Sequence, residues 1–132
     1  MKPVDLVLKL VHAFGRPDDV VALVSPRATW HLYIGSLPPG GTHEGRDAIA
    51  TLMNGVFGPI YVPDTVRVTV HDYFGTDDRA VVRFRLEAQT SWGAPYSNEY
   101  SLMASVSDGR IDEVWEFLDG IAASEQLRAA DG

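Results

Sequence analysis

The chain has 132 residues, of which 45% are hydrophobic and 22% are charged, values that predict one globular domain over residues 1–132. Its formal net charge of −7 excludes the basic stripe that nucleic-acid binding requires and disfavours an anionic membrane surface as a partner. The absence of cysteine excludes thiol chemistry, and because no signal peptide or membrane-spanning run is evident we expect a cytoplasmic protein.

The N-terminal segment is predicted to form two helices. Apolar residues at helical spacing predict a helix over 4–14 that ends at Gly15. A second, short helix begins at Pro17, a residue suited to the first helical position, and we expect Pro26 to limit it.

The next segment is predicted to form a strand and a third helix, separated by a loop rich in proline and glycine. β-branched and aromatic residues predict the strand over 28–34. The third helix is expected over 48–54, with Asp47 as its N-cap and Gly55 at its end.

The second half of the chain alternates apolar and polar residues with a period of two, which predicts four antiparallel strands. The Asp108-Gly109 pair predicts a tight hairpin between the last two strands, and Asp119 is suited to cap a closing helix. The four predicted strands cover residues 65–74, 80–88, 97–106 and 110–118.

Helices followed by an antiparallel meander predict an α+β fold with the helices on one face of the sheet. Long strands twist and curl, so we expect a cone-shaped α+β barrel, in which a curved antiparallel sheet wraps around the N-terminal helices. The wide end of such a cone need not be filled by side chains. We therefore predict a pocket for a hydrophobic small molecule at that end.

Two stretches of the sequence resemble a known family. Residues 20–49, "VVALVSPRATWHLYIGSLPPGGTHEGRDAI", resemble the short helix, Trp-His strand, Pro/Gly loop and helix start of the SnoaL-like group in the NTF2-like superfamily. Residues 108–127, "DGRIDEVWEFLDGIAASEQL", resemble its last hairpin, last strand and C-terminal segment. The resemblance implies a ketosteroid-isomerase-like fold and a homodimer formed through the outer face of the sheet. Relatives include a ketosteroid isomerase, epoxide hydrolases, polyketide cyclases, dehydratases and non-catalytic binding domains, so chemistry must be argued from the site.

The catalytic residues of these relatives mostly do not carry over to this chain. The base, tyrosine and neutral acid of the isomerase correspond to Leu32, Leu8 and Leu102. The last-strand acid of the Asp-Arg-Asp set in the epoxide hydrolases corresponds to Glu116, and its other two members correspond to Phe84 and Leu86. Of the two catalytic sets, only the last-strand acid of the hydrolases is therefore present, as Glu116.

Glu116 is the first candidate catalytic residue, and His31 is the second. The family alignment turns Glu116 toward the pocket, where desolvation would raise its pKa, whereas hydrophobicity alone favours Trp115 and Phe117 as the inward face. An imidazole can serve as base, acid or hydrogen-bond donor. Strict alternation places His31 opposite the pocket, so it is either an acid/base group or a surface or interface histidine. No HxH or HExxH spacing occurs, so neither a metal nor another cofactor is expected.

Many aromatic residues are available to hold a ligand, although each can equally be ordinary core. The segment 55–63 is either a lid or a rigid connection packed on the sheet. Asn98 either orients a ligand carbonyl or makes local hydrogen bonds at the start of its strand. The residues predicted to bind substrate are Trp30, Leu32, Phe57, Tyr61, Tyr73, Phe84, Asn98, Tyr100, Leu102 and Leu118.

Two functions from different classes remain open at this point. The first is a cofactor-independent enzyme that isomerises, cyclises, dehydrates or hydrolyses an apolar substrate by acid/base chemistry. The alternative is a non-catalytic module that binds or senses a hydrophobic small molecule. A third interpretation, a protein-interaction partner acting through the outer sheet face, has less support because the pattern shows no exposed apolar patch.

Overall fold

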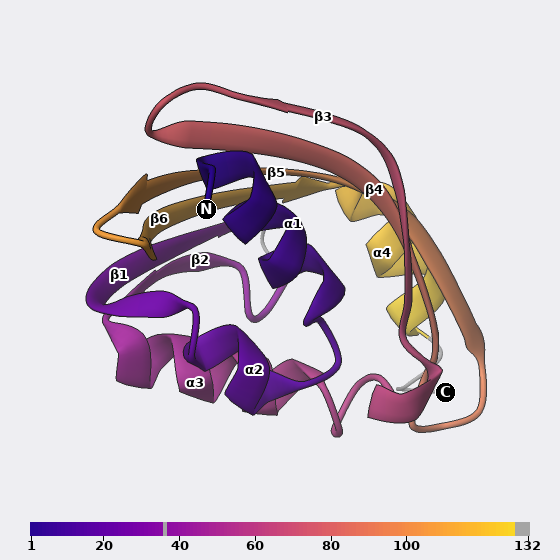
Figure 1. Ribbon diagram of the computed structural model, residues 1–132. Coiled ribbons are helices and arrows are strands. Elements are labelled where there is room, and N and C mark those ends of the chain that lie inside the picture. The colour runs from indigo at the N-terminus through magenta and orange to yellow at the C-terminus, as the bar shows by residue number, and fades with distance from the viewer. Residues whose placement is uncertain (36, 129–132) are drawn as a thin grey trace.

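One curved sheet covers a layer of helices in the computed structural model, which describes residues 1–35 and 37–128 (Figure 1). The helices are α1 (Pro3–His12), α2 (Pro17–Val21), α3 (Arg46–Val56) and α4 (Gly120–Leu127), with a short 3₁₀ turn, η1 (Pro63–Thr65). The strands are β1 (Val24–Tyr33), β2 (Gly41–Glu44), β3 (Arg67–Gly75), β4 (Arg79–Gln89), β5 (Pro95–Ser107) and β6 (Arg110–Leu118).

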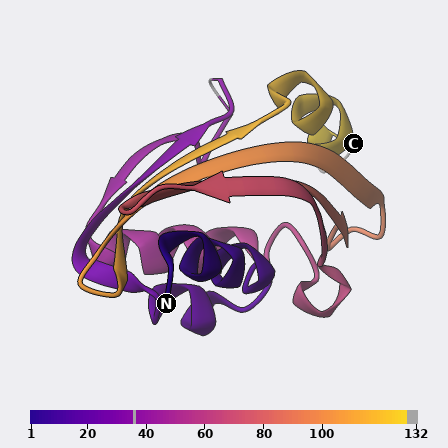
Figure 2. The same ribbon diagram turned by 45° about the horizontal axis from the view of Figure 1, so that its top comes forward.

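The six strands form a mixed sheet in the order β2-β1-β6-β5-β4-β3. The predicted strands β3 to β6 pair antiparallel with their sequence neighbours, whereas β1 joins the sheet parallel to β6. Figure 2 shows the sheet arching over α1, α2 and α3 without closing on itself. The predicted α+β fold is therefore confirmed, with an open, curved sheet and one short strand, β2, that the sequence did not indicate.

Helix α1 packs its apolar stripe against the inner face of the sheet, chiefly against β4. Its buried residues are Leu6, Val7, Leu10 and Val11. The turn that follows needs glycine at position 15, because φ there is +101° and an added Cβ would lie 3.1 Å from the Pro63 carbonyl oxygen. The stop predicted at Gly15 therefore also marks a close approach between α1 and the segment before β3.

Two predicted boundaries near the N-terminus are wrong. Pro26 does not limit a helix but lies inside β1, where the pairing with β6 shifts register between Val24 and Thr29. Asp47 is not the N-cap of α3, since Gly45 occupies that position and Asp47 lies in the first turn. An acid in the first turn still faces the positive end of the helix dipole, which explains its place there.

The local signals near the C-terminus predicted the structure correctly. Asp108 and Gly109 both have positive φ, 53° and 74°, as a tight hairpin between β5 and β6 requires. The Asp119 carboxylate accepts a hydrogen bond from the Ala122 backbone N–H at 3.0 Å and caps α4.

The inner face of the sheet is apolar, and one acid lies within it. The alternation in β6 turns Val114 and Glu116 inward and leaves Trp115 and Phe117 outside. The inward phase follows from the parallel register, because Trp30 lies beside Val114 and Leu32 beside Glu116. The phase favoured by the family alignment is therefore the one in the structure.

Candidate functional site

A cavity of about 350 Å³ lies at one end of the arch, between the inner face of the sheet, α3 and α4. Hydrocarbon side chains dominate its wall, as in pockets for small organic molecules. Its apolar lining includes Phe14, Leu32, Ile34, Leu37, Leu52, Met53, Val56, Phe57, Ile60, Leu86, Leu118, Ala123 and Leu127, and its polar lining includes Tyr61, Trp92, Tyr96, Tyr100 and Glu116.

Among the described residues of this lining, Glu116 is the one carboxylic acid. Its side chain is 7% exposed, and its Oε1 accepts a hydrogen bond of 2.8 Å from the Trp30 indole N–H. Burial raises the pKa of Glu116 from 4.5 to about 7, although the bond from Trp30 acts in the opposite direction. In the described part of the chain the carboxyl group makes no other side-chain hydrogen bond, which leaves Oε2 available to a ligand.

Three tyrosines share the wall with Glu116. The Tyr96 and Tyr100 hydroxyl groups are 2.9 Å apart, and the Tyr61 ring centroid lies 4.8 Å from that of Tyr96. Burial is the main cause that raises the pKa of both Tyr61 and Tyr100 well above 10, and the neighbouring Tyr96 and Glu116 add to it. These hydroxyl groups therefore stay protonated and act as neutral hydrogen-bond donors or acceptors.

Several predicted site residues lie on this cavity wall, drawn together from three strands and one loop segment. Leu32 ends β1, Glu116 and Leu118 end β6, and Tyr100 belongs to β5. Phe57 and Tyr61 come from the segment 55–63. That segment is tied to β4 and its following turn by the bonds from the Val62 N–H to Gln89 and from the Ser91 hydroxyl to Pro59, as in a packed connection.

His31 and Tyr73 lie outside the cavity, so the structure does not bring these two candidates to the site, and His31 takes the outer-face position that strict alternation gives it. His31 is on the outer face of β1, with Nε2 2.6 Å from a Glu113 carboxylate oxygen and Nδ1 3.0 Å from the Thr42 hydroxyl. Tyr73 is 55% exposed, because β3 is an edge strand whose last five residues are all exposed. Tyr73 pairs with the buried Val82 in the register of β3 with β4 but lies at the sheet edge, away from the cavity lining.

Trp30, Phe84, Leu102 and Asn98 are buried beneath the wall and do not line the cavity. Trp30 supports Glu116, and Phe84 stacks on Tyr100 with ring centroids 5.1 Å apart. Leu102 lies beside Glu116 in the pairing of β5 with β6. All four residues are buried in the core or behind lining residues, so their predicted contact with a ligand is corrected to a supporting position.

Sequence reasoning missed Tyr96, Trp92 and the cavity-lining residues of α3, α4 and the proline-rich loop. Tyr96 could have been found, because it lies two residues before Asn98 in the same strand phase. Trp92 lies in a turn between β4 and β5, and its indole N–H is buried without a hydrogen-bond partner among the described residues. No periodicity predicts that a turn folds back onto a cavity.

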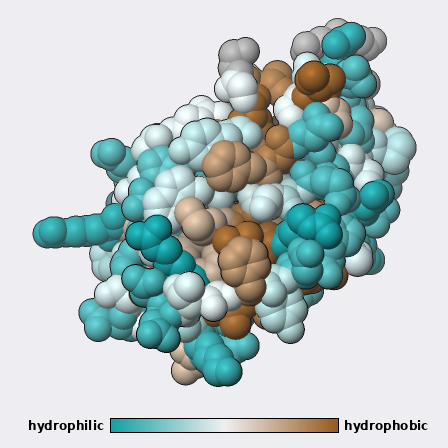
Figure 3. All heavy atoms as spheres, turned by 90° about the horizontal axis from the view of Figure 1, so that it is seen from above, coloured by the Kyte–Doolittle hydropathy of each residue, from teal (hydrophilic) through white to brown (hydrophobic). Residues whose placement is uncertain are grey.

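The outer face of the sheet has an aromatic half, on β1 and β6, and a charged half, on β3, β4 and β5. Parallel pairing places His31 beside Trp115 and Tyr33 beside Phe117, and the last pair is stacked with centroids 4.5 Å apart. We call these four residues the outer aromatic cluster. Figure 3, seen from above the view of Figure 1, shows hydrophobic residues exposed between hydrophilic ones, and Tyr33 and Phe117 are 46% and 48% exposed. An exposed apolar patch is thus present, contrary to the expectation from the pattern.

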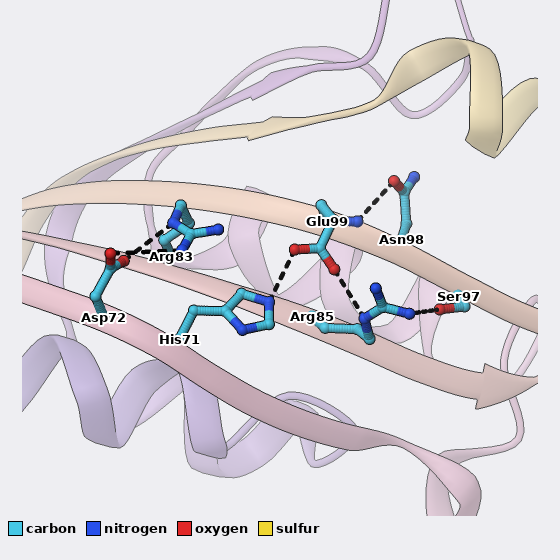
Figure 4. A network of polar contacts seen from close by, with 7 residues as sticks. All are labelled: His71, Asp72, Arg83, Arg85, Ser97, Asn98 and Glu99. Atoms are coloured by element: carbon cyan, nitrogen blue, oxygen red, sulfur yellow. Dashed lines mark hydrogen bonds and ion pairs between the residues drawn. The ribbon is translucent and has the colours of Figure 1, made fainter.

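The strands β3, β4 and β5 carry ion pairs on the same outer face (Figure 4). The Glu99 carboxylate lies 2.8 Å from His71 Nε2 and 2.8 Å from Arg85 Nε. Asp72 and Arg83 form a second pair at 3.0 Å. This half of the face is polar and internally neutralised.

Neither a metal-ligand cluster nor a membrane-spanning helix occurs among the described residues. Across residues 1–35 and 37–128, no three His, Cys, Asp or Glu side chains gather closely enough to hold a metal ion. None of the helices in these ranges has the length and hydropathy needed to cross a bilayer.

Comparison with known proteins identifies a sequence family and a group of structural neighbours. A family model described as a SnoaL-like domain matches residues 7–114. No curated protein matches the chain at a significant level.

Solved structures of similar fold cover nearly the whole chain. A protein of unknown function with a cystatin-like fold from Xanthomonas campestris has a TM-score of 0.80 at 20% identity, covering 96% of this chain and 98% of its own. TerC, co-crystallised with polyporic acid, has a TM-score of 0.79 at 18% identity, covering 94% and 96%. A ketosteroid-isomerase-like protein from Catenulispora acidiphila, in complex with trimethylamine, has a TM-score of 0.78 at 16% identity, covering 97% and 95%. At these identities the likeness establishes the fold alone.

Proposed function

Because this chain belongs to the SnoaL-like domain family, we propose that its cavity binds one small, mostly apolar molecule and that Glu116 transfers a proton on it. One observation carries the proposal. A carboxyl group with a pKa of about 7 lies at the wall of a cavity of about 350 Å³ whose remaining lining is almost entirely hydrocarbon or phenol. At neutral pH both forms of this group are populated, so the same residue can remove a proton and return it.

The surroundings of Glu116 suit proton transfer. Apolar walls keep water away from the carboxylate and strengthen its interaction with a bound molecule. The indole N–H of Trp30 holds Oε1 and so orients Oε2 toward the cavity. Isomerisation, cyclisation and dehydration can proceed with one such group, and epoxide hydrolysis would use it together with a bound water; we propose that the protein performs one of these reactions without a metal or other cofactor.

The alternative function is a binding or sensing module that leaves its ligand unchanged. A specific observation favours it, namely that apolar residues occupy the other positions at which relatives carry catalytic groups. Leu32 and Leu86 are hydrocarbon on the cavity wall, while Phe84 and Leu102 are sealed in the core. Glu116 would then serve as a hydrogen-bond partner for the ligand.

We also propose that two copies of the chain pair through the outer face of the sheet. The outer aromatic cluster supports this, because Tyr33 and Phe117 are 46% and 48% exposed although they stack on one another. The ion pairs on β3, β4 and β5 would lie beside this contact and favour one pairing geometry. The cytoplasmic location expected from the sequence stays a prediction.

A comparison of two single-atom variants on one strand tests the enzymatic proposal. Protein purified by gentle methods is first analysed by native mass spectrometry for a retained apolar molecule. The wild type, Glu116→Gln and Glu113→Gln are then incubated with the extracted molecule and with a panel of uncharged aromatic ketones, lactones and epoxides. We expect the wild type and Glu113→Gln to convert one compound, and Glu116→Gln to be slower by about 10²–10⁴-fold while still binding it.

The other outcomes separate the two functions. A ligand that binds the wild type and is recovered unchanged after long incubation supports the binding module and contradicts catalysis. Equal turnover by Glu116→Gln and the wild type rejects Glu116 as the acid/base group. If no apolar molecule is retained and none of the panel binds, the cavity is not a ligand site.

A further inference from the structure

The cavity wall contains a chain of hydrogen bonds that does not involve Glu116. Asn98, Tyr96 and Tyr100 occupy alternate positions of β5 and point to the same inner face. The Asn98 amide donates to the Tyr96 hydroxyl at 3.0 Å, and the Tyr96 and Tyr100 hydroxyl groups are 2.9 Å apart. All three side chains are at least 94% buried, and the two tyrosines line the cavity.

The direction of this chain follows from the partners of Asn98. Its Oδ1 accepts from the Glu99 backbone N–H at 2.8 Å, and its Nδ2 also donates to the Asp119 carbonyl oxygen at 3.0 Å. A carbonyl only accepts, so the amide cannot be turned around, and the Tyr96 oxygen must accept from Asn98. Once it accepts from Asn98, the Tyr96 hydroxyl still carries one proton, and the Tyr100 oxygen at 2.9 Å is the acceptor placed for it, with the Tyr61 hydroxyl as a second phenol beside the pair.

In this arrangement the Tyr100 proton is available to a ligand or to the neighbouring Tyr61 hydroxyl. Each hydrogen bond that a hydroxyl accepts makes it a stronger donor, so the two preceding bonds strengthen Tyr100 as a donor. Its ring is held by stacking on Phe84, with centroids 5.1 Å apart and an interplanar angle of 10°. Burial, and next the neighbouring tyrosines and Glu116, raise the pKa of Tyr100, so its proton stays in place at neutral pH.

The charge of the wall limits what this donor can meet. Glu116 is the only ionisable group of the described lining apart from the tyrosines, and no Lys, Arg or His accompanies it. A ligand carboxylate or phosphate would thus lie near an acid without a compensating cation, which is costly in an apolar cavity. An uncharged oxygen acceptor meets no such cost.

We propose that Tyr100 recognises an uncharged oxygen acceptor, such as a carbonyl, on the ligand of this cavity, with Asn98 and Tyr96 as positioning residues that set the direction of its proton. This inference rests on the proposed function, since it assigns chemistry to the same cavity. It names a specificity-determining residue that lies outside the positions at which the isomerase and hydrolase relatives carry catalytic groups. Asn98 acts from behind the wall and does not touch the ligand.

The test uses probes that differ by one group. Methyl naphthyl ketone carries the acceptor, isopropenylnaphthalene replaces the carbonyl oxygen with a methylene of similar shape, and naphthoate replaces the methyl ketone with a carboxylate. Their affinities are measured by calorimetry for the full-length wild type, Tyr100→Phe, Tyr96→Phe and Tyr33→Phe, the last being the matched control on the outer face. The carbonyl stretching frequency of the bound ketone is recorded by infrared spectroscopy.

We expect Tyr100→Phe to weaken ketone binding about tenfold while changing the affinity of the hydrocarbon less than about twofold. The bound carbonyl frequency should rise in Tyr100→Phe and take an intermediate value in Tyr96→Phe, which keeps the donor but removes its orienting bond. Tyr33→Phe should match the wild type in both measurements. The wild type should bind naphthoate more weakly than the ketone.

Several results overturn the inference, and they are distinguishable from failure of the proposed function. Equal losses for the ketone and the hydrocarbon show that Tyr100 acts by packing alone, and an unchanged ketone affinity and frequency show that it is not the donor. Tighter binding of naphthoate overturns the uncharged class. In each of these cases the wild type still binds an apolar probe, so the proposed binding function stands. Absence of binding by both neutral probes overturns the inference together with that function.

Discussion

The two faces of the β1–β6 pair each carry a glutamate, and these two glutamates differ in burial and in their partners. On the outer face of β6, Glu113 lies 2.6 Å from His31 and is partly exposed to water. Three residues later, on the inner face, Glu116 is 7% exposed and is bonded only to the Trp30 indole among the described side chains. The face of the strand therefore decides the role of each acid: Glu113 forms a surface contact, whereas Glu116 is a candidate catalytic group. Burial without a counter-charge raises the pKa of Glu116 to about 7.

The largest expected effect concerns the pH dependence of stability. The folded state holds the Glu116 proton more tightly than the unfolded state, because the pKa is raised from 4.5 to about 7. The folded state therefore binds more protons between these values, so the free energy of unfolding falls as the pH rises through this window. The shift corresponds to about 3 kcal/mol.

Urea unfolding at several pH values between 4 and 8 measures this effect for the wild type, Glu116→Gln and Glu113→Gln. We expect Glu116→Gln to lose this part of the pH dependence and Glu113→Gln to retain it. If the curve of Glu116→Gln runs parallel to that of the wild type, the inner acid is not held in its protonated form by burial.

The next effect concerns the Trp30 indole, the donor that the described residues give to Glu116. Trp30→Phe removes a 2.8 Å bond to the carboxylate, so the pKa of Glu116 should rise further above about 7. Losing a bond to an ionised group should also lower stability by about 1–3 kcal/mol at alkaline pH. Infrared titration of the protonated carboxyl band, assigned with Glu116→Gln, measures the pKa.

Trp115→Phe is the matched control for that variant, because Trp115 belongs to the same pair of strands but faces outward. Its Glu116 titration should coincide with that of the wild type. A carboxyl band that titrates identically in Trp30→Phe would show that the indole bond does not hold the acid.

A smaller effect is expected at the outer aromatic cluster. Phe117→Lys places a charge where we propose that two copies meet, and it should weaken dimerisation by at least about tenfold. Sedimentation velocity over a range of concentrations measures the association. Tyr73→Lys, on the exposed end of β3, adds the same charge outside the cluster and should leave it unchanged. Monomers at all concentrations in the wild type would contradict the proposed pairing.

The smallest effect is expected for the ion pairs of the outer face. His31→Gln removes the contact with Glu113 but leaves the inner face intact, so stability should change by less than about 1 kcal/mol. His71→Gln, which removes the contact with Glu99, should behave alike. A change in the Glu116 titration in His31→Gln would show that the two faces are coupled through β1, which would break the contrast between them.

Those parts of the fold that depend on neighbours in the sequence could be predicted. The hairpin at Asp108 and Gly109 and the cap at Asp119 follow from local backbone preferences, and the β6 strand coincides with the predicted range 110–118. Alternation also placed the inner faces of β4 and β5 correctly, because each strand buries one face only. Strong periodicity thus sufficed for the fold class.

The rest depends on contacts between distant segments. Hydrophobicity could not choose the phase of β6, since Trp115 and Phe117 are more apolar than the face that contains Glu116. That choice and the outer aromatic cluster both follow from the parallel pairing of β1 with β6, which joins residues more than 80 positions apart. The wall contributed by Trp92 and Leu127 comes from a turn and a terminal helix, for which no pattern predicts a direction.

The sheet holds the candidate catalytic acid, whereas loops and a terminal helix form much of the cavity wall, and this difference affects how ligand specificity can evolve. Glu116 is anchored in the sheet by Trp30, whereas much of the surrounding wall comes from the loop at 37–39, the segment 55–63, the turn near Trp92 and one face of α4. Substitutions in those loops and that terminal helix disturb few core contacts. Changes in these segments can therefore alter which ligand the cavity binds without moving the Glu116 carboxyl group.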